Sequence, residues 1–189
     1  MDSALIISNA DKGTAFFSEQ LNTAAINRIS VLSSCSEARR SLLEHDYDLV
    51  IINAPLKDET GEALARSIAS KGLAQVILLV KNEFFDEISA ICEEDGVLVV
   101  SRPINRAIFW SALQFAKSAR NRIRRVQTEN ERLKQKIEDI RIVDRAKCLL
   151  ISHMKLSEQE AHRVIEKQAM DMRSTKRAIA EEILKTYEN

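Results

Sequence analysis

Short apolar runs recur along the first part of the chain and alternate with amphipathic stretches. Five runs rich in valine, isoleucine and leucine predict strands at residues 4–8, 29–32, 49–52, 76–80 and 97–100. The runs are nearly continuous, which is typical of parallel strands covered by helices on both faces. Amphipathic stretches predict intervening helices at residues 13–21, 37–43 (behind a Ser36 cap), 62–69 and 84–91, and a fifth helix after Pro103. This alternation predicts an α/β fold with a doubly wound parallel sheet.

The fifth predicted helix has no sequence signal that would end it early. From residue 104 to about residue 151 there is neither glycine nor proline. A series of apolar residues, interrupted by one asparagine, recurs there at alternating spacings of three and four: Ile123, Val126, Asn130, Leu133, Ile137 and Ile140. Such spacing is typical of a coiled-coil seam, and a buried asparagine in it favours one register and commonly a parallel dimer. The alternative is one long amphipathic helix packed against its own domain.

The residues flanking this series support a pairing of two chains. Glu129 and Lys134 fall at the g and e positions, where they would be complementary between parallel helices. We expect a homodimer through this segment.

The last fifty residues predict a small helical bundle. A helix end is followed by a loop, and then by a helix that Ser157 caps, with Glu160 completing a capping box. A break near Arg173 precedes one more short helix. Apolar positions in this region can face one another in a three-helix bundle: Leu149, Leu150, Leu156, Ala161, Val164, Ile165, Ala169, Ile179, Ile183 and Leu184. We therefore divide the chain into an α/β domain (1–116), a coiled-coil linker helix (117–140) and an all-α bundle (141–189).

Charge is uneven along the chain, although its formal net charge is zero. Residues 1–116 carry 10 lysines and arginines against 16 acidic residues, whereas residues 117–136 carry 8 against 2. The basic run begins with Lys117, Arg120, Arg122, Arg124 and Arg125. Such a run is most often a solvated helix face, and the alternative is an electrostatic guide for a polyanion.

Several classes of protein are not indicated by the sequence. No signal peptide or membrane span is present, so we expect a cytoplasmic protein without membrane contact. Cys35, Cys92 and Cys148 lie far apart, and the three histidines share no ligand spacing, so neither a disulfide framework nor a metal site is predicted. No nucleophile, base and orienting group occur together. We expect a non-enzyme without a cofactor.

Asn53 stands at the carboxyl end of the third predicted strand, which is where open α/β sheets place their chemistry. This first domain, about 115 residues, resembles the receiver domain of bacterial response regulators, a CheY-like fold. That family carries its phospho-acceptor aspartate at the position of Asn53. A carboxamide is an uncharged, poor nucleophile and a weak ligand for a hard cation, so Asn53 cannot form an acyl phosphate as aspartate does.

The other receiver pocket positions also depart from the family. Ser8 and Asn9 replace its paired acidic residues, Val80 replaces the serine or threonine that ends its fourth strand, and Arg102 replaces its lysine. The bond between Arg102 and Pro103 is expected to be cis, as in that family. The resemblance thus implies the fold without the phosphotransfer. The alternative is that a neighbouring carboxylate, Asp11 or Asp58, compensates for the lost acids.

Three short elements in the last part of the chain occur in a recognisable order. They are Ala146-Lys147-x-x-Leu150, Leu156-Ser157-x-x-Glu160-Ala161 and Ala169-Met170-Asp171. Together they resemble the ANTAR domain, an RNA-binding output module of transcription antiterminators. Departures are Cys148 and Lys155 where that family usually or often has glycine, and His162 where it often has an aromatic residue.

The resemblance implies a dimeric antiterminator that binds paired hairpins in nascent leader RNA, with a regulatory protein partner as a further expectation. Candidate RNA contacts lie outside the apolar set and can form a basic face: Arg145, Lys147, Arg163, Lys167, Arg173, Lys176 and Arg177. Lys147 and Arg173 rank first among them because they lie within the family-like elements. The alternative function is a protein-interaction module that sequesters another regulator and retains only vestigial RNA binding.

Overall fold

The computed structural model describes residues 1–72 and 74–187. Contacts divide the chain into two compact units, Met1–Arg124 and Arg125–Asn189. The first unit contains a five-stranded, wholly parallel sheet in the order β2-β1-β3-β4-β5. Its strands are β1 (Ser3–Ser8), β2 (Arg28–Leu32), β3 (Leu49–Asn53), β4 (Gln75–Lys81) and β5 (Leu98–Arg102). All five predicted strands are therefore confirmed.

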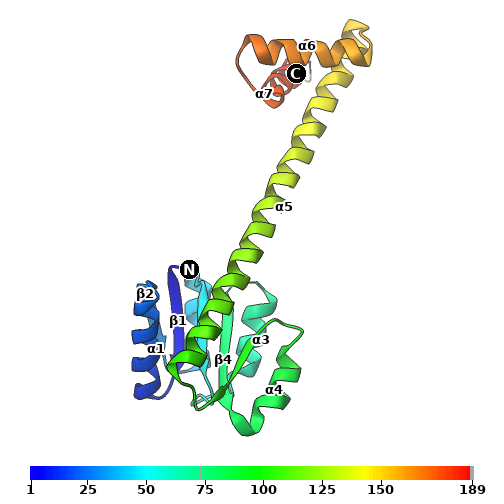
Figure 1. The fold of residues 1–189 in the computed structure, drawn as a ribbon. Coiled ribbons are helices and arrows are strands. Elements are labelled where there is room, and N and C mark those ends of the chain that lie inside the picture. Colours follow the sequence, from blue (N-terminus) through cyan, green and yellow to red (C-terminus); the bar gives the residue numbers. More distant parts are fainter. Residues whose placement is uncertain (73, 188–189) are drawn as a thin grey trace. The chain divides into compact units, whose positions relative to one another are not determined.

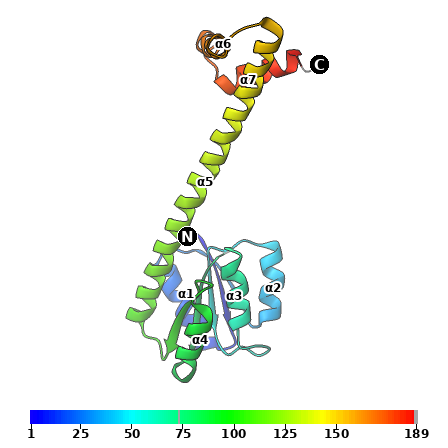
Figure 2. The ribbon, with the colours of Figure 1, turned by 90° about the vertical axis from the view of Figure 1, so that its right-hand side faces the viewer.

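Helices cover both faces of this sheet (Figures 1 and 2). One face packs against α1 (Asp11–Thr23) and the start of α5 (Arg106–Met154), through Phe17, Leu21 and Phe109. The other face packs against α2 (Cys35–Glu44), α3 (Glu62–Ser70) and α4 (Phe85–Cys92), the last of which follows a short 3₁₀ turn, η1 (Asn82–Phe84). The doubly wound α/β fold is confirmed.

Two local predictions need correction. The strands were predicted to be covered on both faces, which holds for β1, β3 and β4, but β2 lies at the sheet edge and leaves Val31 46% exposed. The helix α2 begins earlier than predicted, because Ser34 and not Ser36 accepts the hydrogen bond from the Glu37 amide. Ser36 instead donates its hydroxyl to Asp58.

The beginning of α5 is tied to the first unit by polar contacts. The amide of Ile108 donates to Asn105 Oδ1 at the start of the helix, at 2.9 Å. Further along the helix, the Trp110 indole donates to Gln20 Oε1, and Lys117 Nζ donates to the Ala24 carbonyl oxygen at 3.1 Å. Arg120 lies 3.3 Å from Asp48. Lys117 and Arg120 are therefore held by the α/β unit, while Arg122, Arg124 and Arg125 of the same basic run are exposed.

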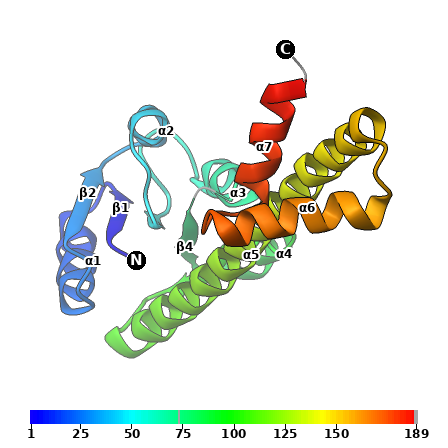
Figure 3. The same cartoon turned by 90° about the horizontal axis from the view of Figure 1, so that it is seen from above.

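The second unit is a three-helix bundle built from the carboxyl-terminal part of α5, α6 (Glu158–Asp171) and α7 (Lys176–Tyr187) (Figure 3). Its core includes Ala146 and Leu150 from α5, Ile165 from α6, and Ile179 from α7. The predicted capping box at Ser157 and Glu160 is present, so the predicted start of α6 is confirmed. None of the helices in the described part of the chain is both long and apolar enough to span a membrane.

Candidate functional site

The pocket that corresponds to a receiver's phosphorylation site lies at the carboxyl ends of the parallel strands. The pairing of β1 with β3 places Ser8 directly opposite Asn53, and Arg102 ends β5 at the same edge of the sheet. Asn53 is only 5% exposed. Its side-chain nitrogen donates to Ser8 Oγ at 3.1 Å, and its oxygen accepts from the Arg102 guanidinium at 3.2 Å. Arg102 also donates to the Ala54 carbonyl oxygen.

Other residues that the sequence assigned to this pocket lie beside it or outside it. Val80 is buried in β4 and belongs to the apolar core under α3 and α4. Asn9 is exposed in the loop after β1. The Arg102–Pro103 bond is cis, as the resemblance predicts. The filled pocket thus consists of Ser8, Asn53 and Arg102.

Gly13 approaches this network closely from the first turns of α1. A Cβ added there would lie 2.7 Å from Asn53 Nδ2 and 3.5 Å from Ser8 Oγ. Real Cβ atoms do not approach other atoms as closely as the first distance, so any larger residue would force the side chain of Asn53 to move. Sequence reasoning missed this role of Gly13, because it appears only once α1 is placed over the strand ends.

The residues of the pocket do not suit the divalent cation that the receiver fold implies. Hard cations select carboxylate oxygens, but Ser8 and Asn53 are neutral and Arg102 brings a positive charge. Asp58, one of two carboxylates considered as a substitute, accepts hydrogen bonds from the amides of Cys35 and Ser36 at 3.0 and 2.9 Å. The other, Asp11, is exposed at the first position of α1.

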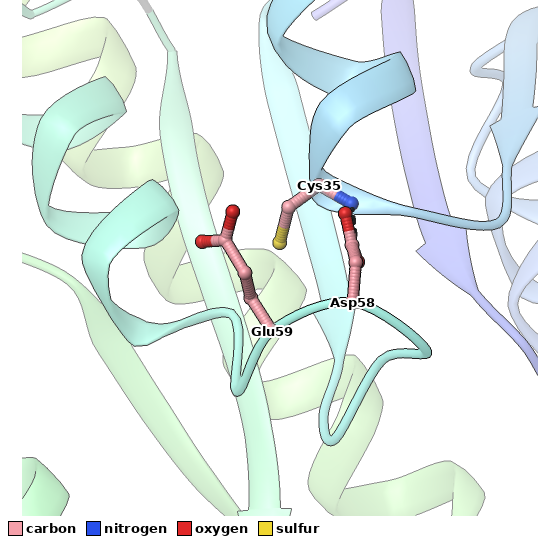
Figure 4. A group of neighbouring side chains, drawn as sticks. All are labelled: Cys35, Asp58 and Glu59. Carbon is pink, nitrogen blue, oxygen red and sulfur yellow. Dashed lines mark hydrogen bonds between the residues drawn. The ribbon is translucent and has the colours of Figure 1, made fainter.

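One cluster of potential metal-ligating side chains occurs among the described residues. Cys35, Asp58 and Glu59 bring their ligand atoms within 4.8 Å of one another (Figure 4). Each has another role: Asp58 caps α2, Glu59 forms a bidentate ion pair with Arg39, and Cys35 is fully buried. Burial raises the pKa of the Cys35 thiol to about 11, whereas the hydrogen bonds from Cys35 and Ser36 lower the pKa of Asp58 to about 2. The cluster is a helix cap beside a protonated thiol.

The predicted coiled-coil residues form an uncovered apolar stripe along α5. Ile123, Val126, Leu133, Ile137 and Ile140 are between 39% and 63% exposed, and Asn130 is exposed among them. Glu129 forms an ion pair with Arg132 of its own helix at 2.8 Å. A single chain therefore leaves the seam open to solvent.

Among the seven candidate RNA contacts, Lys147, Lys176 and Arg177 form ion pairs within the described part of the second unit. Lys147 lies 2.8 Å from Asp144 and 3.3 Å from Glu158, and its side chain is only 15% exposed. Hydrogen bonds to these two acids raise the pKa of Lys147. Lys176 pairs with Glu166 at 2.6 Å.

Arg177 is the third ion-paired candidate, with Asp139 at 2.7 Å and Glu181 at 2.8 Å. Hydrogen bonds from Arg177 and Gln135 lower the pKa of Asp139. A cleft of about 740 Å³ between α5 and the start of α7 is lined in part by Lys147, Lys176 and Arg177. Their charges are therefore balanced locally.

Arg163, Lys167 and Arg173 are exposed, and among the described residues their side chains make no hydrogen bond or ion pair. Arg145 is also exposed but has a partner of its own. Arg163 and Lys167 lie one turn apart on α6, and Arg173 follows the end of that helix. The structure thus places three of the candidate residues along one helix.

Comparison with known proteins accounts for both units. Residues 131–184 match the ANTAR domain, and this match spans the three helices whose core and charges are described above. The second unit carries an ANTAR domain. In a separate comparison, an alignment over 142 residues of the chain shows 28% identity to the transcriptional regulatory protein PdtaR of Mycobacterium tuberculosis strains CDC 1551 and H37Rv. That alignment covers 75% of this chain and 69% of PdtaR.

Solved structures similar to the first unit include several receiver domains. The signal receiver domain of an HD domain-containing protein from Pseudomonas fluorescens Pf-5 has a TM-score of 0.57 at 19% identity, covering 65% of this chain and 91% of that one. The response regulatory domain of mrkE from Klebsiella pneumoniae has a TM-score of 0.56 at 12% identity, covering 64% and 98%. The first unit therefore has the CheY-like receiver fold, joined to an ANTAR domain.

Proposed function

We propose that this protein is a dimeric RNA-binding regulator that promotes transcription antitermination at hairpins of nascent leader RNA in the cytoplasm. The observation that carries the proposal is the ANTAR match over residues 131–184, because antitermination through RNA is the activity of that family. The capped three-helix bundle supplies the expected scaffold for it. We keep the division into residues 1–116, 117–140 and 141–189 as part of the proposal.

Dimerisation in this proposal runs through the apolar stripe on α5. Val126, Leu133 and Ile137 leave apolar surface in water in a single chain, and pairing two stripes would remove it. Exposed Asn130 within the stripe would set the register of a parallel pair. A parallel pair brings two ANTAR domains into one molecule, so one bound hairpin raises the effective concentration of the second.

Control by aspartyl phosphorylation is absent from the proposed mechanism. Support comes from Asn53, whose carboxamide is hydrogen bonded to Ser8 and to the Arg102 guanidinium. An acyl phosphate requires a carboxylate at this point, and the pocket offers none. Control would instead come from a protein partner or from the amount of the regulator.

A mobility-shift titration of the full chain tests the proposal. The probes are a two-hairpin leader RNA from the native host and each of its hairpins alone, with and without acetyl phosphate and Mg²⁺. We expect the two-hairpin RNA to bind about 10²-fold more tightly or better, because the second contact is intramolecular. The phosphodonor should change neither affinity nor protein mass. Equal affinity for one and two hairpins would contradict binding to paired hairpins. A mass gain of one phosphoryl group in the pocket of Asn53 would contradict regulation without aspartyl phosphorylation.

A second candidate function is sequestration of another regulatory protein, with RNA binding vestigial. It is favoured by a pocket of about 310 Å³ between the β3–α3 loop and α4, next to which Phe84 and Ile91 are 48% and 38% exposed. Recovery of one stoichiometric protein partner from nuclease-treated extract, together with no RNA shift, would support this alternative.

A further inference from the structure

Four cationic residues lie in α6 or at its two ends. Arg163 and Lys167 are spaced by one helical turn, with Met170 three residues further on the same face. Ala161, Ile165 and Ala169 form the buried face of the same helix. Lys155 precedes α6 and Arg173 follows it, and both are exposed. We call Lys155, Arg163, Lys167, Met170 and Arg173 the outer α6 surface.

Two acids of α6 near this surface have partners, whereas Asp171, one turn after Lys167, is exposed. Glu160 accepts hydrogen bonds from the amide and hydroxyl of Ser157, and Glu166 pairs with Lys176. By contrast, Arg163 and Lys167 make no ion pair among the described residues, although Arg163 lies close enough to help lower the pKa of Glu160. The outer α6 surface therefore presents cations without an ion pair among the described residues, whereas Lys147 and Lys176 in the cleft are ion-paired.

The backbone at both ends of α6 adds an independent observation. Lys155 has a φ of 58° and Arg173 a φ of 48°, which is the left-handed region that favours glycine. Arg173 occupies this conformation within a complete helix-ending motif, since the Ser174 amide donates to the Ala169 carbonyl oxygen and the Arg173 amide to that of Met170. Glycine would adopt both positions with less strain. Side chains kept where glycine suits the fold better point to a use outside the fold.

Met170 adds an apolar element to this basic surface. Its side chain is 74% exposed, although burying a methionine side chain is energetically favourable. Exposed cations contact phosphates, while unstacked bases of RNA loops pack on flat or adaptable side chains and are read there. A surface with both features fits a single-stranded RNA loop better than a duplex, whose bases are stacked inside.

We propose that the outer α6 surface is where the ANTAR domain contacts the RNA loop, with Lys155, Arg163, Lys167 and Arg173 on phosphates and Met170 against a base. Lys147, Lys176 and Arg177 are positioning residues of the bundle that do not touch RNA. This inference rests on the proposed RNA-binding function and narrows its seven candidate residues, adding Lys155 and Met170.

The sharpest test is the pair of substitutions Lys155→Gly and Arg173→Gly in the full chain. The probe is a fluorescent pool of two-hairpin RNAs with randomised loops. If these side chains serve RNA, each variant should bind the pool about tenfold more weakly, and its salt slope should fall by about one unit per cation removed. The midpoint of thermal unfolding should not fall, because glycine relieves the left-handed strain. Weaker RNA binding at undiminished stability cannot arise from a damaged fold.

Matched variants distinguish the two sets of cations. Arg163→Gln with Lys167→Gln should weaken binding by about 10²-fold, given about tenfold for each phosphate contact. Lys147→Gln with Lys176→Gln removes the same charge from the ion-paired set and should lower the thermal midpoint while changing RNA affinity only about twofold. Met170→Gln should weaken binding without changing the salt slope.

The outcomes separate this inference from the proposed function. If the wild-type chain binds no RNA in the pool or in native leader RNA, the proposed function fails. The wild-type chain can bind RNA while the Arg163→Gln, Lys167→Gln variant binds as tightly, or while the Lys147→Gln, Lys176→Gln variant loses more RNA affinity. Either result overturns only the assignment to the outer α6 surface.

Discussion

The two units of this protein use their polar groups in opposite ways. In the α/β unit the groups in the pocket that corresponds to a receiver's phosphorylation site point at one another: Arg102 donates to Asn53 and Ala54, and Asn53 donates to Ser8. In the ANTAR unit some cations are paired internally, but Arg163 and Lys167 form no ion pair within the part of the chain that the structure describes. The α5 stripe leaves Leu133 and Ile137 exposed.

The difference shows how a residue type gains a role from its partners. Arg102 and Arg163 are both arginines in candidate sites, yet the first donates to a buried acceptor and the side chain of the second makes no hydrogen bond to any residue that the structure describes. A carboxamide whose nitrogen and oxygen are both hydrogen bonded internally, as in Asn53, gains little from a ligand, because binding would first have to break those bonds. A ligand that contacts unpaired charges and exposed apolar side chains does not have to break internal hydrogen bonds. We expect function to lie where the unit leaves its surface unmatched.

The largest effect is expected from charge in the α5 stripe. Replacing Leu133 and Ile137 with aspartate places two carboxylates in the seam, which should cost several kcal/mol of association and give monomers in sedimentation. The control Asn121→Asp with Thr128→Asp adds the same charge on α5 outside the seam series and should remain a dimer. If the seam variant sediments like the control, the two chains associate elsewhere.

Arg102→Ala tests whether the receiver pocket is satisfied internally. The substitution leaves Asn53 Oδ1 and the Ala54 carbonyl oxygen without their donor, so the free energy of unfolding should fall by about 1–3 kcal/mol. Arg40 is exposed on α2, so the control Arg40→Ala should change the free energy of unfolding by less than about 0.5 kcal/mol. Equal stability of the two variants in urea denaturation would show that the pocket network contributes nothing.

Gly13→Ala examines the same pocket from α1. Alanine in a helix normally stabilises by up to about 1 kcal/mol relative to glycine. Here its Cβ would meet Asn53 Nδ2, so we expect a loss of about 1–2 kcal/mol instead. In an Asn53→Ala background the loss should shrink or reverse, because the crowded atom is gone. A double-mutant cycle measured by denaturation gives this coupling, and a coupling of zero would exclude the contact.

The smallest effect concerns acid and the cap of α2. The pKa of Asp58 is lowered from 3.8 to about 2, so its stabilising contribution is complete above pH 4 and is lost as the pH falls towards 2. Asp58→Asn removes the titration, and the stability difference between wild-type and variant should narrow over that range. A constant difference from pH 5 to pH 2 in thermal unfolding would mean that the cap does not depend on the charge.

Much of this architecture follows from local patterns in the sequence. Apolar runs located the strands, and the Ser157–Glu160 spacing located the start of α6, because both signals act within a few residues. What depended on distant contacts was missed: the approach of Gly13 to Asn53, and Asp58 as the acceptor at the start of α2. The family resemblance ranked Lys147 and Arg173 first among RNA contacts, whereas the ion pairs of Lys147 with Asp144 and Glu158 appear only when α5 and α6 pack.

The central claim is that this ANTAR protein acts on RNA without aspartyl phosphorylation. The most direct measurement is crosslinking of the tagged protein to RNA in its native host, followed by sequencing, for wild-type and for Arg163→Gln with Lys167→Gln at equal expression. We predict enrichment of leader segments with two adjacent hairpins for wild-type, and loss of that enrichment for the variant. Recovery of no more RNA with wild-type than with an untagged control would contradict the account.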